Sequence, residues 1–451
     1  MERFSWLLGI RSVGQHSKRN LIAGSAIAVG LIASLFMIGY CAHVSSYLGT
    51  AAIYIQQPGH IAVLKKGGLR YRLIEPKKYS LSALEVAAVE RIASQNPEIS
   101  IVSPYLFGAG LVGNGCKSFP FRATGFSPAK EQRVKDSPDL KSIIPEYRTI
   151  SEGMPLWNSK LTSPVGLSGG LARRLGKSSA GEAVSTDRVF SAADCDIPGI
   201  QAQLAKDPNV QLLTQTYDQR LNAIDSNIAN EFSTGVALTE NNSMQMDIIQ
   251  LQELLQTSDV SYLGIFLKDP SKTDLIAKRI VSDMKAQGLE VDAFTWDDEE
   301  WNPNFIASRN VLLVTQTFIS IVVAAVVLLS ILNTVNIGLV ESRAEIGTLK
   351  ALGYKPRQIA WIFAIESLCV AVVSLIAGSL LGAGLFHWIK TLQIPLKYPG
   401  LSQTSTFQID PPLWTYFAAS ALLCSLIVMT CLFIAKRFAQ QPTLTLLDRG
   451  S

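Results

Sequence analysis

The stretch Glu341–Ile359, with the sequence ESRAEIGTLKALGYKPRQI, decides how this chain is organised. It is charged and lies between two long apolar runs. Residues 310–340 carry no charge, and Trp361–Leu385 carries only Glu366. Within the stretch, the sequence predicts a helix over Glu341–Leu352, because Gly353 is a typical helix end and Pro356 suits the first turn of a following helix.

This predicted helix is longer and more patterned than a connector requires. Ile346, Leu349 and Leu352 lie on one side of it, whereas Arg343 and Lys350 lie elsewhere. A plain connector between antiparallel spans needs only a few residues. Because the apolar residues need a surface to pack on, we interpret the segment as a handle for a second protein, with the membrane surface as the alternative.

Four windows are long and apolar enough to cross a bilayer whose hydrocarbon core is about 30 Å thick. They are Leu21–Tyr40, Leu312–Leu332, Trp361–Leu385 and Leu413–Ile434. The whole chain of 451 residues is 48% hydrophobic with a mean hydropathy of +0.24, too polar for a protein that lies entirely in the membrane. Four runs of this length also argue against buried helices of a large soluble protein.

The orientation follows from the distribution of Lys and Arg in the short flanking segments. These residues are frequent at both ends of the chain and in the Glu341–Ile359 connector, which we place in the cytoplasm. The expected layout is a cytoplasmic segment 1–20, spans 21–41, 310–340, 360–386 and 412–435, the connector 341–359, a short outer loop 387–411 and a cytoplasmic tail 436–451. The first span is too long for a signal-peptide core and is expected to be a retained anchor.

The segment 42–309 is then a large domain outside the cytoplasm. A capping box at Ser82–Glu85 predicts a helix over Ser80–Asn96, followed by a strand at Ile99–Ser103. Near its end, the sequence predicts a strand–helix–strand unit at Ser261–Leu267, Ser271–Gln287 and Leu289–Thr295. The predicted fold class is therefore a four-span helical membrane protein, with spans divided one plus three, and a large α+β extracytoplasmic domain of two subdomains. The middle, from about Ser127 to Gln219, is not assigned.

Several kinds of site are disfavoured. Gly170–Ser178 (GLARRLGKS) superficially resembles a phosphate-binding loop, but five residues instead of four separate the glycines and Leu171 replaces the first required Gly. We expect an amphipathic helix, Leu167–Leu175, instead. No metal-binding spacing, catalytic triad or basic nucleic-acid surface is evident in the sequence. If the chain has no other ATP site, its energy must come from a partner. Cys116 and Cys195 could form a disulfide outside the cytoplasm, which the sequence leaves open.

Small residues recur every four positions in the third span, at Ser374, Gly378 and Gly382. Such a row allows close helix packing, either within one chain or in a dimer. We expect Glu366, in the same span, to make a structural contact rather than relay protons. Asn333 and Asn336 are expected to bond across helices rather than contact substrate.

These residues carry a family resemblance. Arg343–Gly353 (RAEIGTLKALG) is similar to the R-x-E-I-G-x-L-[RK]-A-L-G pattern of the FtsX-like permeases, the mechanotransmitting ABC systems that include MacB and the lipoprotein-releasing LolC and LolE. Glu366, Gly378 and Gly382 resemble the third span of that family. Phe232–Gly235, Leu251–Leu255 and Pro164–Gly176 resemble the lipoprotein-releasing branch, from which Glu240-Asn241-Asn242 departs.

The resemblance implies a transport subunit that is not itself an enzyme. A coupling helix would be seated on a separate ABC ATPase through Arg343, Glu345, Ile346, Gly347, Leu349, Lys350, Leu352 and Gly353. Two permeases, identical or paralogous, would assemble with two ATPases, which bind ATP and Mg, while this chain binds no cofactor. The complex would lie in the bacterial inner membrane and release lipoproteins or other lipophilic substrates, with membrane lipid and a periplasmic carrier or adaptor as further partners. The alternatives are an adaptor-dependent extruder of drugs, peptides or toxins and a signal relay that activates a periplasmic partner.

Overall fold

The structure is a computed structural model that describes residues 17–56, 58–144, 150–177, 195, 203, 205–396 and 405–440. These residues form two compact units. The helical unit comprises the described residues up to Ser45, Arg309–Ile394 and the described residues from Thr406 onward. The α/β unit comprises Ser46–Ser308 and the described part of Pro395–Ser405.

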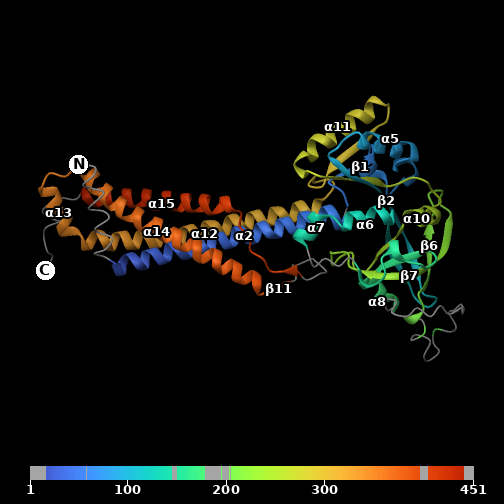
Figure 1. The fold of residues 1–451 in the computed structure, drawn as a ribbon, viewed down its shortest axis with the longest axis horizontal. Coiled ribbons are helices and arrows are strands. Elements are labelled where there is room, and N and C mark those ends of the chain that lie inside the picture. The colour runs from blue at the N-terminus through green and yellow to red at the C-terminus, as the bar shows by residue number, and fades with distance from the viewer. Residues whose placement is uncertain are drawn as a thin grey trace. The chain divides into compact units, whose positions relative to one another are not determined.

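Four long helices dominate Figure 1: α2 (Ser17–Ala51), α12 (Pro303–Glu341), α14 (Pro356–Thr391) and α15 (Leu413–Ala439). Each is long and apolar enough to cross a membrane. All four predicted windows are therefore helical, and each helix extends beyond the window that predicted it. Ile27, Leu31 and Leu35 of α2 form a shared core with residues of the other three helices.

The α/β unit is built on one ten-stranded sheet with the order β10-β1-β9-β2-β3-β8-β5-β7-β4, in which β6 pairs with β2 and β7. The strands are β1 (Ile61–Lys65), β2 (Ile99–Gly113), β3 (Ser118–Phe126), β4 (Ile150–Gly153), β5 (Pro164–Ser168), β6 (Asn209–Gln215), β7 (Leu221–Phe232), β8 (Ser243–Asp247), β9 (Tyr262–Leu267) and β10 (Val291–Thr295). The long strand β2 lies inside the sheet, between β9 and β3. It pairs with β9 over Ile99–Tyr105 and with β3 over Tyr105–Gly113.

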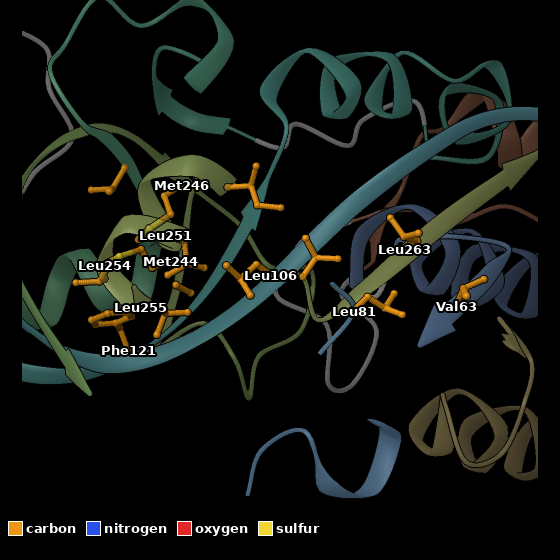
Figure 2. Close-up of a cluster of buried hydrophobic side chains, with 14 of the residues drawn as sticks. Val63, Leu81, Leu106, Phe121, Met244, Met246, Leu251, Leu254, Leu255 and Leu263 are labelled. Atoms are coloured by element: carbon orange, nitrogen blue, oxygen red, sulfur yellow. The ribbon is translucent and has the colours of Figure 1, made fainter. Parts of the chain in front are cut away.

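The helices of this unit pack on the sheet or in its connections. They are α3 (Gly68–Tyr71), α4 (Pro76–Tyr79), α5 (Ala83–Ser94), α6 (Pro128–Lys135), α7 (Pro138–Ile143), α8 (Gly169–Leu175), α10 (Ile248–Leu255) and α11 (Thr273–Ala286), with the short turns η1 (Ala52–Gln56), η2 (Leu156–Asn158) and η4 (Pro270–Lys272). Figure 2 shows the core, in which Leu251, Leu254 and Leu255 of α10 lie among Phe121, Met244 and other apolar residues of the sheet. A separate two-stranded sheet pairs β11 (Pro395–Leu396) with β12 (Ser405–Thr406).

Several local predictions are confirmed. The side chains of Ser82 and Glu85 form the predicted capping box at the start of α5. The strand–helix–strand unit exists as β9, α11 and β10, and β1 lies between the two strands and pairs antiparallel with both. The sequence leaves the pairing of Cys116 and Cys195 open, and in the structure these two residues form a disulfide.

The strand predicted at Ile99–Ser103 continues to Gly113. Glycines in this extension conceal the strand pattern. Close packing explains why a glycine is needed at position 108. A Cβ atom at Gly108 would lie 2.9 Å from Leu251 Cδ1. The absence of a side chain therefore lets α10 approach the sheet closely.

Candidate functional site

The connector singled out by the sequence folds as a separate short helix, α13 (Arg343–Ala351). Only Ser342 separates it from the end of α12 at Glu341. Lys355 precedes the next helix, where its backbone N–H donates to Gln358 Oε1 at 2.8 Å and Pro356 occupies the first turn. The predicted succession of helix, Gly and Pro is thus confirmed in the structure.

The end of α13 is a Schellman motif. The Gly353 N–H donates to the Lys350 carbonyl at 3.0 Å, and the Tyr354 N–H donates to the Leu349 carbonyl at 3.1 Å. Gly353 has a φ of 90°, a conformation that glycine adopts without steric cost. Leu349 and Tyr354 both pack against the same buried apolar cluster. The joint between α13 and α14 is therefore fixed by backbone and side-chain contacts together.

One face of α13 is locked into its own chain. Ile346 is 0% exposed and packs in a cluster with Leu339 of α12, Ile359 of α14 and Ala435 of α15. Gly347 is buried and Leu349 is half-buried. Two of the three apolar residues that we expected to face a partner thus pack inside the chain, because the ends of α12, α14 and α15 supply the apolar surface that they need.

The opposite face of α13 is open. Leu352 is 72% exposed, and Ala344, Glu345 and Thr348 are also exposed. Arg343 is exposed with its guanidinium 5.7 Å from the centre of the Phe438 ring, and Lys350 is half-buried. The predicted set of coupling residues therefore divides into an anchoring face and a presenting face, a division that the sequence pattern did not reveal.

The small-residue row of α14 packs against α2 of the same chain. A Cβ atom at Gly378 would lie 3.0 Å from Ala28 Cα, and one at Gly382 would lie 3.4 Å from Ile32 Cγ1. One turn earlier, a Cβ atom at Gly24 would lie 2.6 Å from Ser374 Oγ. Residue numbers rise together along the contact, so α2 and α14 run parallel, as expected for two spans that leave the same side of a membrane. Of the two alternatives for this row, the structure shows packing within one chain.

Glu366 of α14 is buried and lines a small cavity of about 60 Å³. The cavity lies among all four long helices, and its polar lining includes Asn20, Thr334 and Ser367. Ser367 Oγ donates to Cys431 Sγ at 3.2 Å. The helices thus bury Glu366 beside a partly polar cavity.

A second, larger cavity of about 470 Å³ lies within the helical unit among α2, α12 and α15. Its lining is mostly apolar, with Leu312, Leu313, Leu422 and Leu423 among the residues, and Arg309 lies at the start of the α12 contribution. Pockets of this volume and character are typical of sites for small or lipophilic ligands. No sequence pattern indicates this cavity, because its residues come from three separate segments.

In the α/β unit, Glu240 forms hydrogen bonds with two of the segments that resemble the lipoprotein-releasing branch, Phe232–Gly235 and Pro164–Gly176. Its carboxylate accepts hydrogen bonds from Ser233 Oγ at 2.7 Å and from the Thr234 N–H at 3.2 Å. Its carbonyl accepts from Ser168 Oγ at 2.8 Å and from the Leu171 N–H at 3.0 Å. The start of α8 is thus occupied by the chain itself.

Lys177, which follows α8, also has an internal partner. Its buried Nζ donates to the Asp207 carbonyl at 2.6 Å, and burial lowers the pKa of this amine. Since α8 spans Gly169–Leu175 and Gly176 has a φ of 68°, the segment folds as a short helix with a glycine end rather than as a phosphate loop.

A buried polar network, not anticipated from the sequence, fastens η1 to the sheet. The Lys135 ammonium donates to the Tyr54 carbonyl at 2.5 Å and lies 3.2 Å from Glu131 Oε1. Glu131 Oε2 accepts from the Tyr105 hydroxyl of β2 at 3.0 Å. Nearby, burial lowers the pKa of His60 to about 4, and its Nδ1 accepts from the Leu267 N–H at 3.2 Å. These residues come from five segments that are separate in the sequence, so no local sequence pattern indicates the network.

Comparison with known proteins finds similarity over part of the chain. A protein of Bacillus subtilis (strain 168), the ABC transporter permease YtrF, is 19% identical over 215 residues, which is 48% of this chain and 47% of that protein. This chain therefore spans about half the length of its curated relative.

Two solved structures are also similar in part. The periplasmic region of MacB from Actinobacillus actinomycetemcomitans gives a TM-score of 0.32 at 13% identity, covering 54% of this chain and 91% of that one. The extracellular domain of YknZ, an ABC-type transporter from Gram-positive bacteria, gives a TM-score of 0.30 at 9% identity. This match covers 48% of this chain and 90% of that one. Both scores are too low to establish a common fold. The family model described as FtsX-like permease C-terminal matches residues 317–443, which contain most of α12 and all of α13, α14 and α15, so this part of the chain is similar to the C-terminal domain of FtsX-like permeases.

Proposed function

We propose that this chain is the membrane-spanning subunit of an ATP-driven ABC transporter of the mechanotransmission type. The match of residues 317–443 to the FtsX-like permease model supports the transporter class. The observation that carries the coupling role is the two-faced α13, with Ile346 fully buried and Leu352 72% exposed. A helix held rigidly on one side and open on the other can receive a force from a separate ATPase and pass it on.

The contacts of α13 define a route for that force inside the helical unit. The Schellman motif at Gly353 joins α13 directly to α14. In turn, α14 lies in close contact with α2 along Gly378 and Gly382. Because packed side chains have discrete arrangements, a shift of α13 moves these helices together rather than being absorbed locally. Both α2 and α12 lead along the chain into the α/β unit, which is the proposed moving part.

For the cargo, we propose a lipophilic substrate, including the lipid-modified end of a lipoprotein. The cavity of about 470 Å³ among α2, α12 and α15 supports this choice, because it is mostly apolar and carries a cationic residue, Arg309. An acyl chain fits the apolar lining, and a guanidinium suits an anionic or carbonyl-rich head. In this proposal, ATP and Mg²⁺ are bound by the ATPase, and the membrane is the cytoplasmic membrane of a bacterium.

Affinity purification of the tagged full-length chain from native membranes tests the proposal. We expect an ABC ATPase to co-purify, and Leu352→Asp to remove most of it, because a charge would replace an exposed apolar contact. Leu392→Asp is the matched control, since Leu392 is also an exposed leucine (50%) at the end of a helix, α14. The proposal fails if no ATPase co-purifies, if Leu352→Asp retains it as well as Leu392→Asp does, or if the chain purified alone hydrolyses ATP.

A further inference from the structure

Where α2 ends, the chain departs from α-helical geometry. The turn η1 (Ala52–Gln56) is a π-helix, a rare geometry that is frequent at functional positions. The last carbonyl groups of a helix have no partner within it and need one elsewhere. Here the Ile53 carbonyl accepts from the Gly59 N–H at 2.8 Å, and the Tyr54 carbonyl accepts from the Lys135 ammonium at 2.5 Å. A charged side chain from a distant segment therefore holds the end of α2.

The side chain of Tyr54 is held as well. It is 4% exposed, and its hydroxyl donates to Asp139 Oδ2 of α7 at 3.2 Å. Its ring stacks on that of Phe266 in β9, with 5.8 Å between the ring centres. Contacts at the carbonyl, the ring and the hydroxyl thus fix this residue on the α/β unit, to which all of these residues belong.

The chain itself attaches the long helices to only one part of the sheet. The strand β1 follows η1, and β10 precedes α12. We call β10, β1 and β9 the β1 part of the sheet, and β3, β8, β5, β7 and β4 the β3 part. Among the described strands, β2 alone pairs with both parts, and the change occurs at Tyr105, which is opposite Tyr262 of β9 and Phe126 of β3. The β3 part therefore has no direct chain connection to α2 or α12.

The Lys135 side chain supplies a connection that the chain does not. Lys135 is the last residue of α6, and only Ser127 separates α6 from the end of β3. Its ammonium lies 3.2 Å from Glu131 Oε1 of the same helix, and Glu131 Oε2 accepts from the Tyr105 hydroxyl at 3.0 Å. The side chains of Lys135 and Glu131 are 9% and 3% exposed, so these bonds are shielded from water, where charge-assisted hydrogen bonds are strong.

We propose that Lys135 is a positioning residue that makes the β3 part of the sheet follow the end of α2. Without its bond to the Tyr54 carbonyl, β2 and the shared apolar core still join the two parts, but the β3 part loses its fixed point on α2. A displacement of α2 would then reach the β1 part and be dissipated as a twist about β2. This inference rests on the proposed function, in which α2 moves the α/β unit, and it adds the residue that makes this unit move as one body.

Spin-label distance measurements on the full-length chain in detergent test the inference. Leu275→Cys labels α11, which lies between β9 and β10 in the chain, and Met154→Cys labels the end of β4 in the β3 part. Both positions are open to a label, being 70% and 62% exposed. The free cysteines are replaced by Ser, namely Cys41, Cys369, Cys424 and Cys431. Hydrogen exchange of the η1 amides is measured on the same variants without labels.

The test variant is Lys135→Met with Glu131→Gln, because the second change removes a charge that would otherwise be buried alone. The matched control is Lys77→Met with Asp218→Asn. This ion pair of 2.6 Å also joins the two parts of the sheet, but it is exposed and does not involve η1, so its loss should matter little. Should the test variant not fold, Lys135→Met with Glu131→Leu replaces it, since apolar replacement of a buried ion pair is often neutral, and the same outcomes apply.

The test variant should broaden the distribution of distances between the two labels about twofold, because the two parts then fluctuate separately. It should also speed exchange of the η1 amides about 10- to 150-fold, the range for a lost hydrogen bond to a charged group. The control should change neither. An unaltered distribution, unaltered η1 exchange, or equal effects in the control would overturn the inference. These measurements need no ATPase, so their failure refutes the role of Lys135 alone, whereas failure of an ATPase to co-purify refutes the proposed function.

Discussion

The two faces of α13 predict opposite behaviour for two substitutions, at Ile346 and at Leu352, which lie six residues apart in the sequence. Ile346→Ala removes three carbon atoms from a side chain that is 0% exposed, whereas Leu352→Ala truncates one that is 72% exposed. Truncating a fully buried Ile to Ala costs about 2–5 kcal/mol, which includes the cavity that is left. This cost falls on the contacts between α13 and the ends of α12, α14 and α15. Leu352→Ala has no comparable internal contact to lose.

Hydrogen exchange on the full-length chain in detergent measures this difference. With 1.4 kcal/mol per factor of ten, Ile346→Ala should speed exchange of the α13 amides by roughly 30-fold to several thousand-fold, up to the limit set by free exchange. Leu352→Ala should change the exchange rate of the α13 amides less than threefold, but it should weaken the binding of the proposed ATPase partner. If Ile346→Ala leaves exchange unaltered, or Leu352→Ala accelerates it as much, the assignment of the two faces is wrong.

Three further predictions concern stability, measured by thermal unfolding of the full-length chain. Gly378→Ala should destabilise it by about 1–3 kcal/mol, because the added Cβ meets Ala28, while Gly384→Ala, with no atom within 4 Å, should not. Lys135→Met should cost about 3–5 kcal/mol by leaving the buried Glu131 charge without its ammonium, and adding Glu131→Gln should recover much of this loss. His60, with its pKa lowered to about 4 by burial, binds protons more readily when unfolded, so stability should fall by up to about 3 kcal/mol as the pH drops from about 6.5 to about 4. His60→Phe should flatten that slope, and an unchanged slope would contradict the assignment.

The elements that could be predicted from the sequence are those encoded by neighbouring residues. The capping box of Ser82 and Glu85 and the Gly353–Pro356 boundary each depend on residues within one turn, and both occur in the structure. The four long helices were predictable because an apolar run of twenty residues has few other solutions. Glycine-rich β2 was only half predicted, since Gly108 and Gly110 serve packing against other segments and interrupt the strand pattern.

The short helix α13 was predictable from the sequence, but the way it packs was not. The periodicity of Ile346, Leu349 and Leu352 indicates an apolar side, yet it contains no information on which surface covers that side. The answer depends on Ala435 and Ile359, which are distant in sequence. The network of Lys135, Tyr54 and Glu131 was missed for the same reason, because each residue alone looks like an ordinary surface residue.

The distribution of tight and open contacts within the helical unit favours transmission of a displacement over a static anchor. A static anchor gains nothing from a separate helix that is capped at Gly353 and exposed on one side. A transmitter needs that exposed side, and it needs stiff contacts behind it. The Gly378 contact leaves less room than a methyl group between α14 and α2, so the two helices cannot slide independently without opening a gap in close packing. Gly378→Ala should therefore reduce stability and coupling together, whereas Leu352→Ala should reduce coupling alone. A variant that loosened the α2–α14 contact without changing ATP-driven function would show that force does not pass through it.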